Sequence, residues 1–125
     1  MAPKSFSVRI FLQDGHADGV KVIAKSKWPG RALVIPRSSL AEEIDRKELN
    51  ACGVYVLVGP SAVGDLQTLY IGAAENLCHD LRGHDTQEAF WRWVVVFASK
   101  NESLSMSQAR YFESRLMRLA QEAKR

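Results

Sequence analysis

Two short stretches decide the fold of this chain, GVYVLV at residues 53–58 and LYI at residues 69–71. Both are rich in β-branched and aromatic residues and too short for helices, which is typical of buried strands. A polar loop containing Gly59 and Gly64 joins them. We therefore expect the two strands to pair, with the hydroxyls of Tyr55 and Tyr70 emerging on one face.

The residues that follow predict a β-β-α-β-α order. Apolar residues recur at helical spacing from residue 74 to residue 81, and residues 93–98 form a β-branched, aromatic run. A last helix is predicted from about residue 107 to residue 122, with the polar residues Ser105 to Gln108 as its cap.

The N-terminal residues read as a β-rich extension. Alternation over residues 6–12 indicates a half-buried strand, and two more strands are predicted at 20–24 and 32–35. The SLAE pattern at 39–42 predicts a helix ending near Glu48. We expect one α+β domain, with the extension over residues 1–50 and the core over 51–125. Its sheet should be small, mainly antiparallel and flanked by helices.

Composition limits the possible classes of protein. The chain has 125 residues, of which 46% are hydrophobic and 25% charged, as in ordinary globular proteins. No apolar run is long enough for a transmembrane helix, and Lys4 and Arg9 interrupt any signal-peptide core. We therefore expect a cytoplasmic protein without a membrane partner. Cys52 and Cys78 are expected to be buried structural thiols, since their surroundings lack zinc-like ligand spacing.

A basic stretch precedes the core. Residues 19–41 contain Lys25, Lys27, Arg31 and Arg37, together with Lys21, and no acidic residue. Such a stretch provides the sequence-independent part of nucleic-acid affinity. The alternative is an ordinary solvated face of a β-ribbon, and the sequence favours neither.

Glu113 interrupts the apolar stripe of the last helix. It lies four residues after Ala109 and three before Leu116, so it shares their face. A carboxylate there is costly to bury unless it is paired or bound to a cation, and glutamate oxygen suits Mg²⁺. A salt bridge with Arg110 or Arg115 is the structural alternative.

Together these features resemble the GIY-YIG nuclease family. Gly53-Val54-Tyr55 and Tyr70-Ile71-Gly72 match its two tyrosine–glycine motifs, His84 matches a helical histidine twelve residues after the second glycine, and Glu113 matches its metal-binding glutamate.

Segments outside these motifs extend the likeness to nearly the whole chain. RIFL at 9–12, WPGR at 28–31 and PRS at 36–38 resemble a bacterial subgroup with a β-rich extension, as does the stretch from residue 90 to residue 100.

The resemblance implies a DNA endonuclease that hydrolyses phosphodiesters with Mg²⁺ or Mn²⁺. It implies a catalytic group of Tyr55, Tyr70, His84 and Glu113, with Glu113 as the metal ligand. Tyr55 would act as base or relay, while Tyr70 and His84 would position phosphate and water. Lys25, Lys27, Arg31, Arg37 and Arg82 are the expected DNA contacts.

One position departs from the family. Eight residues after Gly72 the family has an arginine that holds the scissile phosphate, and this chain has Asp80. Aspartate reverses the charge and repels a phosphate. Arg82 is the nearest substitute, but two residues along a helix correspond to a turn of roughly 200°. Many family members also carry an asparagine some residues beyond the metal-binding glutamate. The residues from Glu113 to Arg125 contain no matching asparagine.

Three hypotheses remain open at this point. The first is a metal-dependent endonuclease weakened by Asp80, and the second is an inactive module of the same fold that binds nucleic acid or protein. The third is an unrelated α+β protein with accidental motifs. Asn76, Asp80 and His84 also fall on one helical face, where Asp80 could add a second metal-binding carboxylate to Glu113 or simply be solvated.

Overall fold

The computed structural model describes residues 7–25, 30–60, 67–87, 90–99 and 104–123. Its strands are β1 (Val8–Leu12), β2 (Lys21–Lys25), β3 (Gly30–Pro36), β4 (Gly53–Pro60), β5 (Gln67–Ala74) and β6 (Trp93–Ser99). Its helices are α1 (Leu40–Glu43), α2 (Leu77–Gln87) and α3 (Met106–Ala123), with 3₁₀ turns η1 (Arg37–Ser39) and η2 (Lys47–Leu49).

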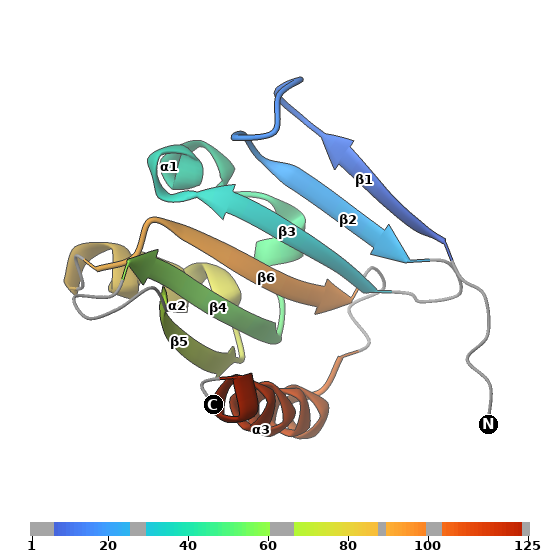
Figure 1. Cartoon of the computed structure of the whole chain (residues 1–125), viewed down its shortest axis with the longest axis vertical. Helices are drawn as coiled ribbons and strands as arrows, with labels where there is room; N and C mark the ends of the chain where they lie inside the picture. The colour runs from blue at the N-terminus through green and yellow to red at the C-terminus, as the bar shows by residue number, and fades with distance from the viewer. Residues whose placement is uncertain (1–6, 26–29, 61–66, 88–89, 100–103, 124–125) are drawn as a thin grey trace.

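The six strands form one antiparallel sheet in the order β1-β2-β3-β6-β4-β5 (Figure 1). The predicted α+β class, the mainly antiparallel sheet and the β-β-α-β-α order after residue 51 are confirmed. β3 pairs with β6 from Gly30↔Ser99 to Pro36↔Trp93. The N-terminal strands therefore continue the same sheet as the core strands.

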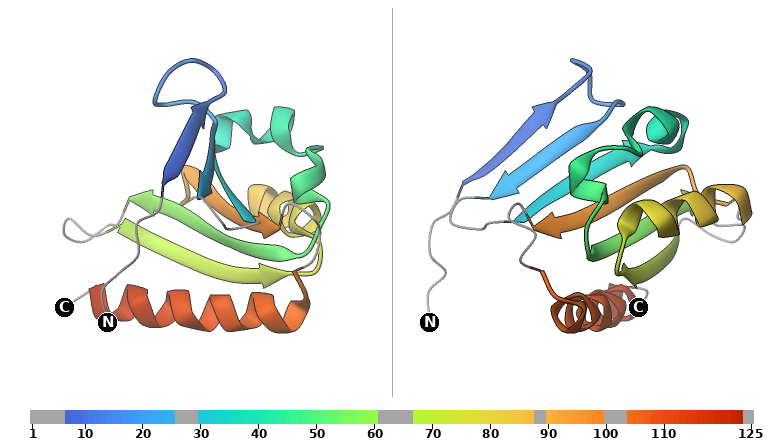
Figure 2. Two further views of the ribbon diagram at one scale, coloured as in Figure 1. Left: turned by 90° about the vertical axis from the view of Figure 1, so that its right-hand side faces the viewer. Right: turned by 180° about the vertical axis from the view of Figure 1, so that it is seen from behind.

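Helical layers cover the two faces of the sheet unequally. α1, η2 and α2 contribute side chains to one core with β3, β4 and β6. α3 lies on the opposite face, where it contacts β5 and β4 (Figures 1 and 2). Among the described residues, no helix has the length and apolar character needed to span a membrane.

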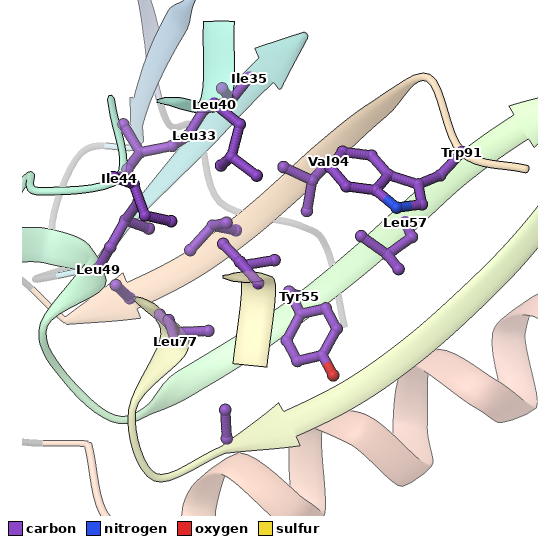
Figure 3. Packing of buried hydrophobic residues seen from close by; sticks show 14 of the residues in the cluster. Leu33, Ile35, Leu40, Ile44, Leu49, Tyr55, Leu57, Leu77, Trp91 and Val94 are labelled. Carbon is purple, nitrogen blue, oxygen red and sulfur yellow. The ribbon is translucent and has the colours of Figure 1, made fainter. Parts of the chain in front are cut away.

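The main core lies between the sheet and the helices α1 and α2. Leu77 of α2 is fully buried in one cluster with Leu57, Val94 and Trp91 (Figure 3). Leu81 of the same helix is also fully buried in this cluster. Burying each such side chain contributes about 1.5–3 kcal/mol, so this layer fixes α2 firmly on the sheet. The ring of Tyr55 belongs to the same cluster.

Three sequence predictions need correction. The helix expected from residue 39 to residue 48 is broken into α1 and η2, because Arg46 takes an extended conformation with ψ 141°. Its guanidinium binds Glu43 and Glu48 on the two sides of this break. The expected Ser39 side-chain cap is absent. β1 is exposed throughout instead of half-buried, because no helix covers it.

Candidate functional site

Tyr55 and Tyr70 lie together on the α2 face of the sheet, as predicted. Tyr55 is paired with Gly72, and Leu57 is paired with Tyr70, so the two tyrosines are diagonal neighbours. Their rings stack with centroids 6.2 Å apart and an interplanar angle of 22°. Tyr55 is only 2% exposed, whereas Tyr70 is 44% exposed. The pair therefore has one buried and one solvent-facing phenol.

Gly72 is what allows the Tyr55 ring to occupy its position. A Cβ atom at residue 72 would lie 2.7 Å from both Cζ and Oη of Tyr55. Real Cβ atoms essentially never come so close to another heavy atom. The glycine of the second motif thus has a steric role.

Helix α2 brings two more functional side chains to the tyrosines. Asn76 caps this helix, because its Oδ1 accepts a hydrogen bond of 3.0 Å from the backbone N–H of His79. Leu77 and Leu81 face the core, so Asp80 and His84, one turn apart, are directed at the tyrosines. The ring of His84 lies 5.4 Å from that of Tyr55 and 4.8 Å from that of Tyr70.

The Tyr55 hydroxyl lies between two polar partners. Its oxygen is 2.8 Å from Nε2 of His84, and it donates to Oδ2 of Asp80 at 3.3 Å. A phenol has one proton, so donation to Asp80 requires Nε2 of His84 to carry a proton and donate to the phenol. Both contacts are satisfied in one direction, from His84 through Tyr55 to Asp80. This series of hydrogen bonds can pass a proton from the Tyr55 hydroxyl toward the carboxylate of Asp80.

Arg37 holds the end of α2 that carries His84. Its guanidinium donates to the backbone oxygen of Asp85 at 2.8 Å and to that of Trp91 at 3.2 Å. It also pairs with the carboxylate of Asp85 and lies 4.4 Å from the Trp91 ring centroid. Arg37 was expected to contact nucleic acid, and the contacts described for its side chain are with Asp85 and Trp91 of the same protein.

Glu113 lies on the other side of β5. It is half-buried in a hollow of about 410 Å³ with Leu69 and Ile71, which point away from the tyrosine face. Tyr70 also lines this hollow, because β5 is the edge strand and both sides meet around it. The structure therefore brings Tyr55, Tyr70, His84 and Asp80 together, and it connects Glu113 with Tyr70 but not with Tyr55.

The salt bridge that the sequence offered as a structural role for Glu113 is not found among the described residues. Within the described residues, Glu113 forms no salt bridge with Arg110 or Arg115. Over the same residues, no three His, Cys, Asp or Glu side chains gather into a metal site. Asp80 is not among the described residues that line the hollow holding Glu113.

Arg31 and Arg82 are the other expected DNA contacts whose side chains the structure describes, and each is engaged with a carboxylate. Arg31 pairs with Glu48 at 3.7 Å, and Arg82 is directed toward Asp45, at 3.3 Å. Arg82 thus points away from the tyrosines, as its helical position predicts. Lys27 and the side chain of Lys25 lie outside the described residues.

Asp80 is the residue that sequence reasoning understood least. The sequence suggested a charge that repels phosphate, a second metal-binding carboxylate or a solvated residue, whereas the structure gives Asp80 a hydrogen bond from Tyr55. The spacing of residues 76, 80 and 84 on one helical face was the only available signal. Asn76 is nevertheless used for capping α2 and for a bond to Asn50.

Comparison of the chain with protein families, with characterised proteins and with solved structures gives no match.

Proposed function

We propose that this chain is a GIY-YIG-type DNA endonuclease domain that hydrolyses phosphodiesters with a divalent cation. The observation that carries the proposal is the convergence of Tyr55, Tyr70 and His84, with Tyr55 bonded to His84 at 2.8 Å. The three residues come from three different elements, β4, β5 and α2, and meet beside the edge strand β5. A chance motif match does not require this meeting.

The proton-handling groups fit hydrolysis. Water attacks phosphorus, a new P–O bond forms and the ester P–O bond to the leaving oxygen breaks. The water proton passes to the Tyr55 hydroxyl while the Tyr55 proton moves to Asp80, and the leaving oxygen takes a proton from solvent. Tyr70, which is partly exposed, donates to a non-bridging phosphate oxygen.

Glu113 fits a site for Mg²⁺ or Mn²⁺ in which the protein supplies one carboxylate. Mg²⁺ usually keeps several waters and is bound by one or two carboxylates together with substrate phosphate oxygens. The half-buried carboxylate of Glu113 lies beside Tyr70 and forms no salt bridge with the described residues, so it can provide such a ligand. The cation supplies charge neutralisation on the phosphate and the leaving oxygen.

Asp80 weakens this activity. Its negative charge lies beside Tyr55, where the family's arginine would attract the phosphate. Electrostatic stabilisation of this kind is worth about 2.7–4 kcal/mol for one donor, which corresponds to 10²–10³ in rate. We therefore expect slow cleavage compared with a site that has arginine there.

Plasmid cleavage tests the proposal. Supercoiled DNA is incubated with the protein and Mg²⁺ or Mn²⁺, and nicked and linear products are quantified. Glu113→Ala should abolish cleavage, whereas Glu122→Ala, on the exposed C-terminal turn of the same helix, should leave it unchanged. Cleavage that persists in Glu113→Ala would exclude the assigned site.

A second candidate is a catalytically inactive module of the same fold that binds nucleic acid or protein. The hydrogen bond from the Tyr55 hydroxyl to Asp80 favours this candidate. The proton of this hydroxyl is donated to a carboxylate of the protein and not to a substrate. Asp80→Arg distinguishes the two candidates, with Glu122→Arg as a control for the same change in charge. Cleavage that appears only in Asp80→Arg identifies the natural chain as a binding module.

A further inference from the structure

The face of the sheet that carries α3 is largely open. α3 contacts β4 and β5, and within the part of the chain that the structure describes no helix lies over β2, β3 or the outer part of β6 on this face (Figure 2). The registers Lys21↔Val34 and Val34↔Val95 place alternate residues of these strands on this open face. The aromatic residues Trp93 and Phe97 of β6 belong to the same set.

Two hollows follow one another along β6 on the open face. The first has about 320 Å³ and is lined by Lys21, Arg92 and Trp93, with Val34 and Pro36 as its floor. The second has about 450 Å³ and is bounded by Phe97 and Phe112, with aliphatic residues between them. Phe112, on α3, is 46% exposed.

The charges around these hollows are mainly positive. Lys21 and Arg92 border the first hollow, and Asp18 of the preceding turn is the acidic residue among its described lining side chains. The described lining side chains of the second hollow are all apolar. Arg115 lies three residues after Phe112, and both are exposed on α3. An anionic partner with flat apolar groups is complementary to this surface.

We propose that the open face, defined by Lys21, Trp93, Phe97 and Phe112, binds single-stranded nucleic acid. The choice of nucleic acid as the ligand rests on the proposed function. The open face itself is separate from the tyrosine cluster, which lies on the opposite face of the sheet. Trp93 and Phe97 stack on unpaired bases, and Lys21 and Arg92 contact phosphates.

The spacing of the aromatic residues fits an extended strand. Trp93 and Phe97 are four residues apart on one strand, which corresponds to about 13 Å. An extended chain of nucleotides can place bases at both positions while its backbone follows β6. A duplex keeps its bases stacked internally, so it cannot fill the two hollows in this way.

Binding is measured by fluorescence anisotropy with a fluorescein-labelled 12-nucleotide DNA of mixed sequence. The Glu113→Ala chain is used with a chelator, so that binding is read without cleavage. Lys21→Glu should raise Kd on the order of tenfold and reduce the dependence of Kd on salt. Lys47→Glu is the matched control, because Lys47 is an exposed lysine in η2, away from the open face.

A second pair of variants tests stacking. Trp93→Leu keeps an apolar side chain in β6 but should raise Kd roughly tenfold, because the stacking surface is lost. Phe11→Leu should have no effect, since Phe11 alternates with Ile10 and points to the other face of the sheet. Circular dichroism confirms that each variant keeps its fold before binding is compared.

The outcomes separate this proposal from the proposed function. Binding that depends on Lys21 and Trp93 supports the surface even when plasmid cleavage fails, in which case only the enzyme assignment falls. The surface is overturned when Lys21→Glu and Trp93→Leu bind the single strand like their controls, or when they weaken the binding of a blunt duplex as much as that of the single strand. It is also overturned when an acidic amphipathic peptide binds this face and DNA does not.

Discussion

Replacing Gly72 by alanine tests the packing that places Tyr55 beside His84. The added Cβ would lie 2.7 Å from Cζ and Oη of Tyr55, whereas carbon atoms prefer separations of about 3.5–4.0 Å. The ring must therefore retreat by roughly 1 Å. Because Tyr55 is packed into the core, it cannot move freely, and its hydroxyl leaves Nε2 of His84.

The expected loss of stability has two parts. Overpacking of a filled site costs about 1–3 kcal/mol. The lost Tyr55–His84 hydrogen bond adds about 1 kcal/mol. We expect Gly72→Ala to lower the free energy of unfolding by roughly 2–4 kcal/mol and Tm by roughly 10 °C.

Gly83→Ala is the matched control for this substitution. Gly83 lies inside α2, and its added Cβ would meet nothing within 4 Å. Alanine there should raise stability by about 0.5–1 kcal/mol, because glycine is a poor helix former. Urea unfolding of both variants measures the two effects. A Gly72→Ala protein as stable as the original chain refutes the steric role assigned to residue 72.

Three further predictions follow from single contacts. Burial alone raises the pKa of Glu48, but the hydrogen bond and charge of Arg46 lower it below its usual value. The pair therefore stabilises the folded protein at pH values above the pKa that Glu48 has in the unfolded chain. This stabilisation is lost as the pH falls through the lower pKa of Glu48 in the folded protein. Glu48→Gln should therefore flatten the acid limb of a curve of stability against pH. Burial and the charge of Glu75 raise the pKa of the Cys52 thiol, so a disulfide reagent should modify it slowly at pH 8 and faster at higher pH, while Glu75→Gln should speed the reaction. Tyr55→Phe should keep the fold, cost about 1 kcal/mol by urea unfolding and abolish cleavage.

The strands of the core could be predicted because their residue types agree with their burial. GVYVLV at 53–58 and the run at 93–98 are β-branched and aromatic, and both became strands buried at the centre of the sheet. The cap of α3 was likewise visible in the sequence, and Ser105 and Gln108 exchange backbone and side-chain hydrogen bonds there.

Features that depend on distant parts of the chain could not be predicted. Alternation in β1 shows which residues share a face, but not whether a helix covers that face. The contacts of Arg37 with Asp85 and Trp91 span about fifty positions of the sequence. The sequence therefore did not reveal that Arg37 binds the end of α2. The place of Glu113 across β5 from Tyr55 depends on how α3 packs, which its own apolar stripe does not determine.

We propose that the tyrosine cluster and Glu113 serve one centre around the edge of β5. Titrating Mn²⁺ into ¹⁵N-labelled protein and recording paramagnetic broadening of amide signals measures this directly. We expect the strongest broadening at Glu113 and Tyr70, with weaker broadening at His84, all lost in Glu113→Ala. Broadening confined to other carboxylates, or unchanged in Glu113→Ala, would contradict it.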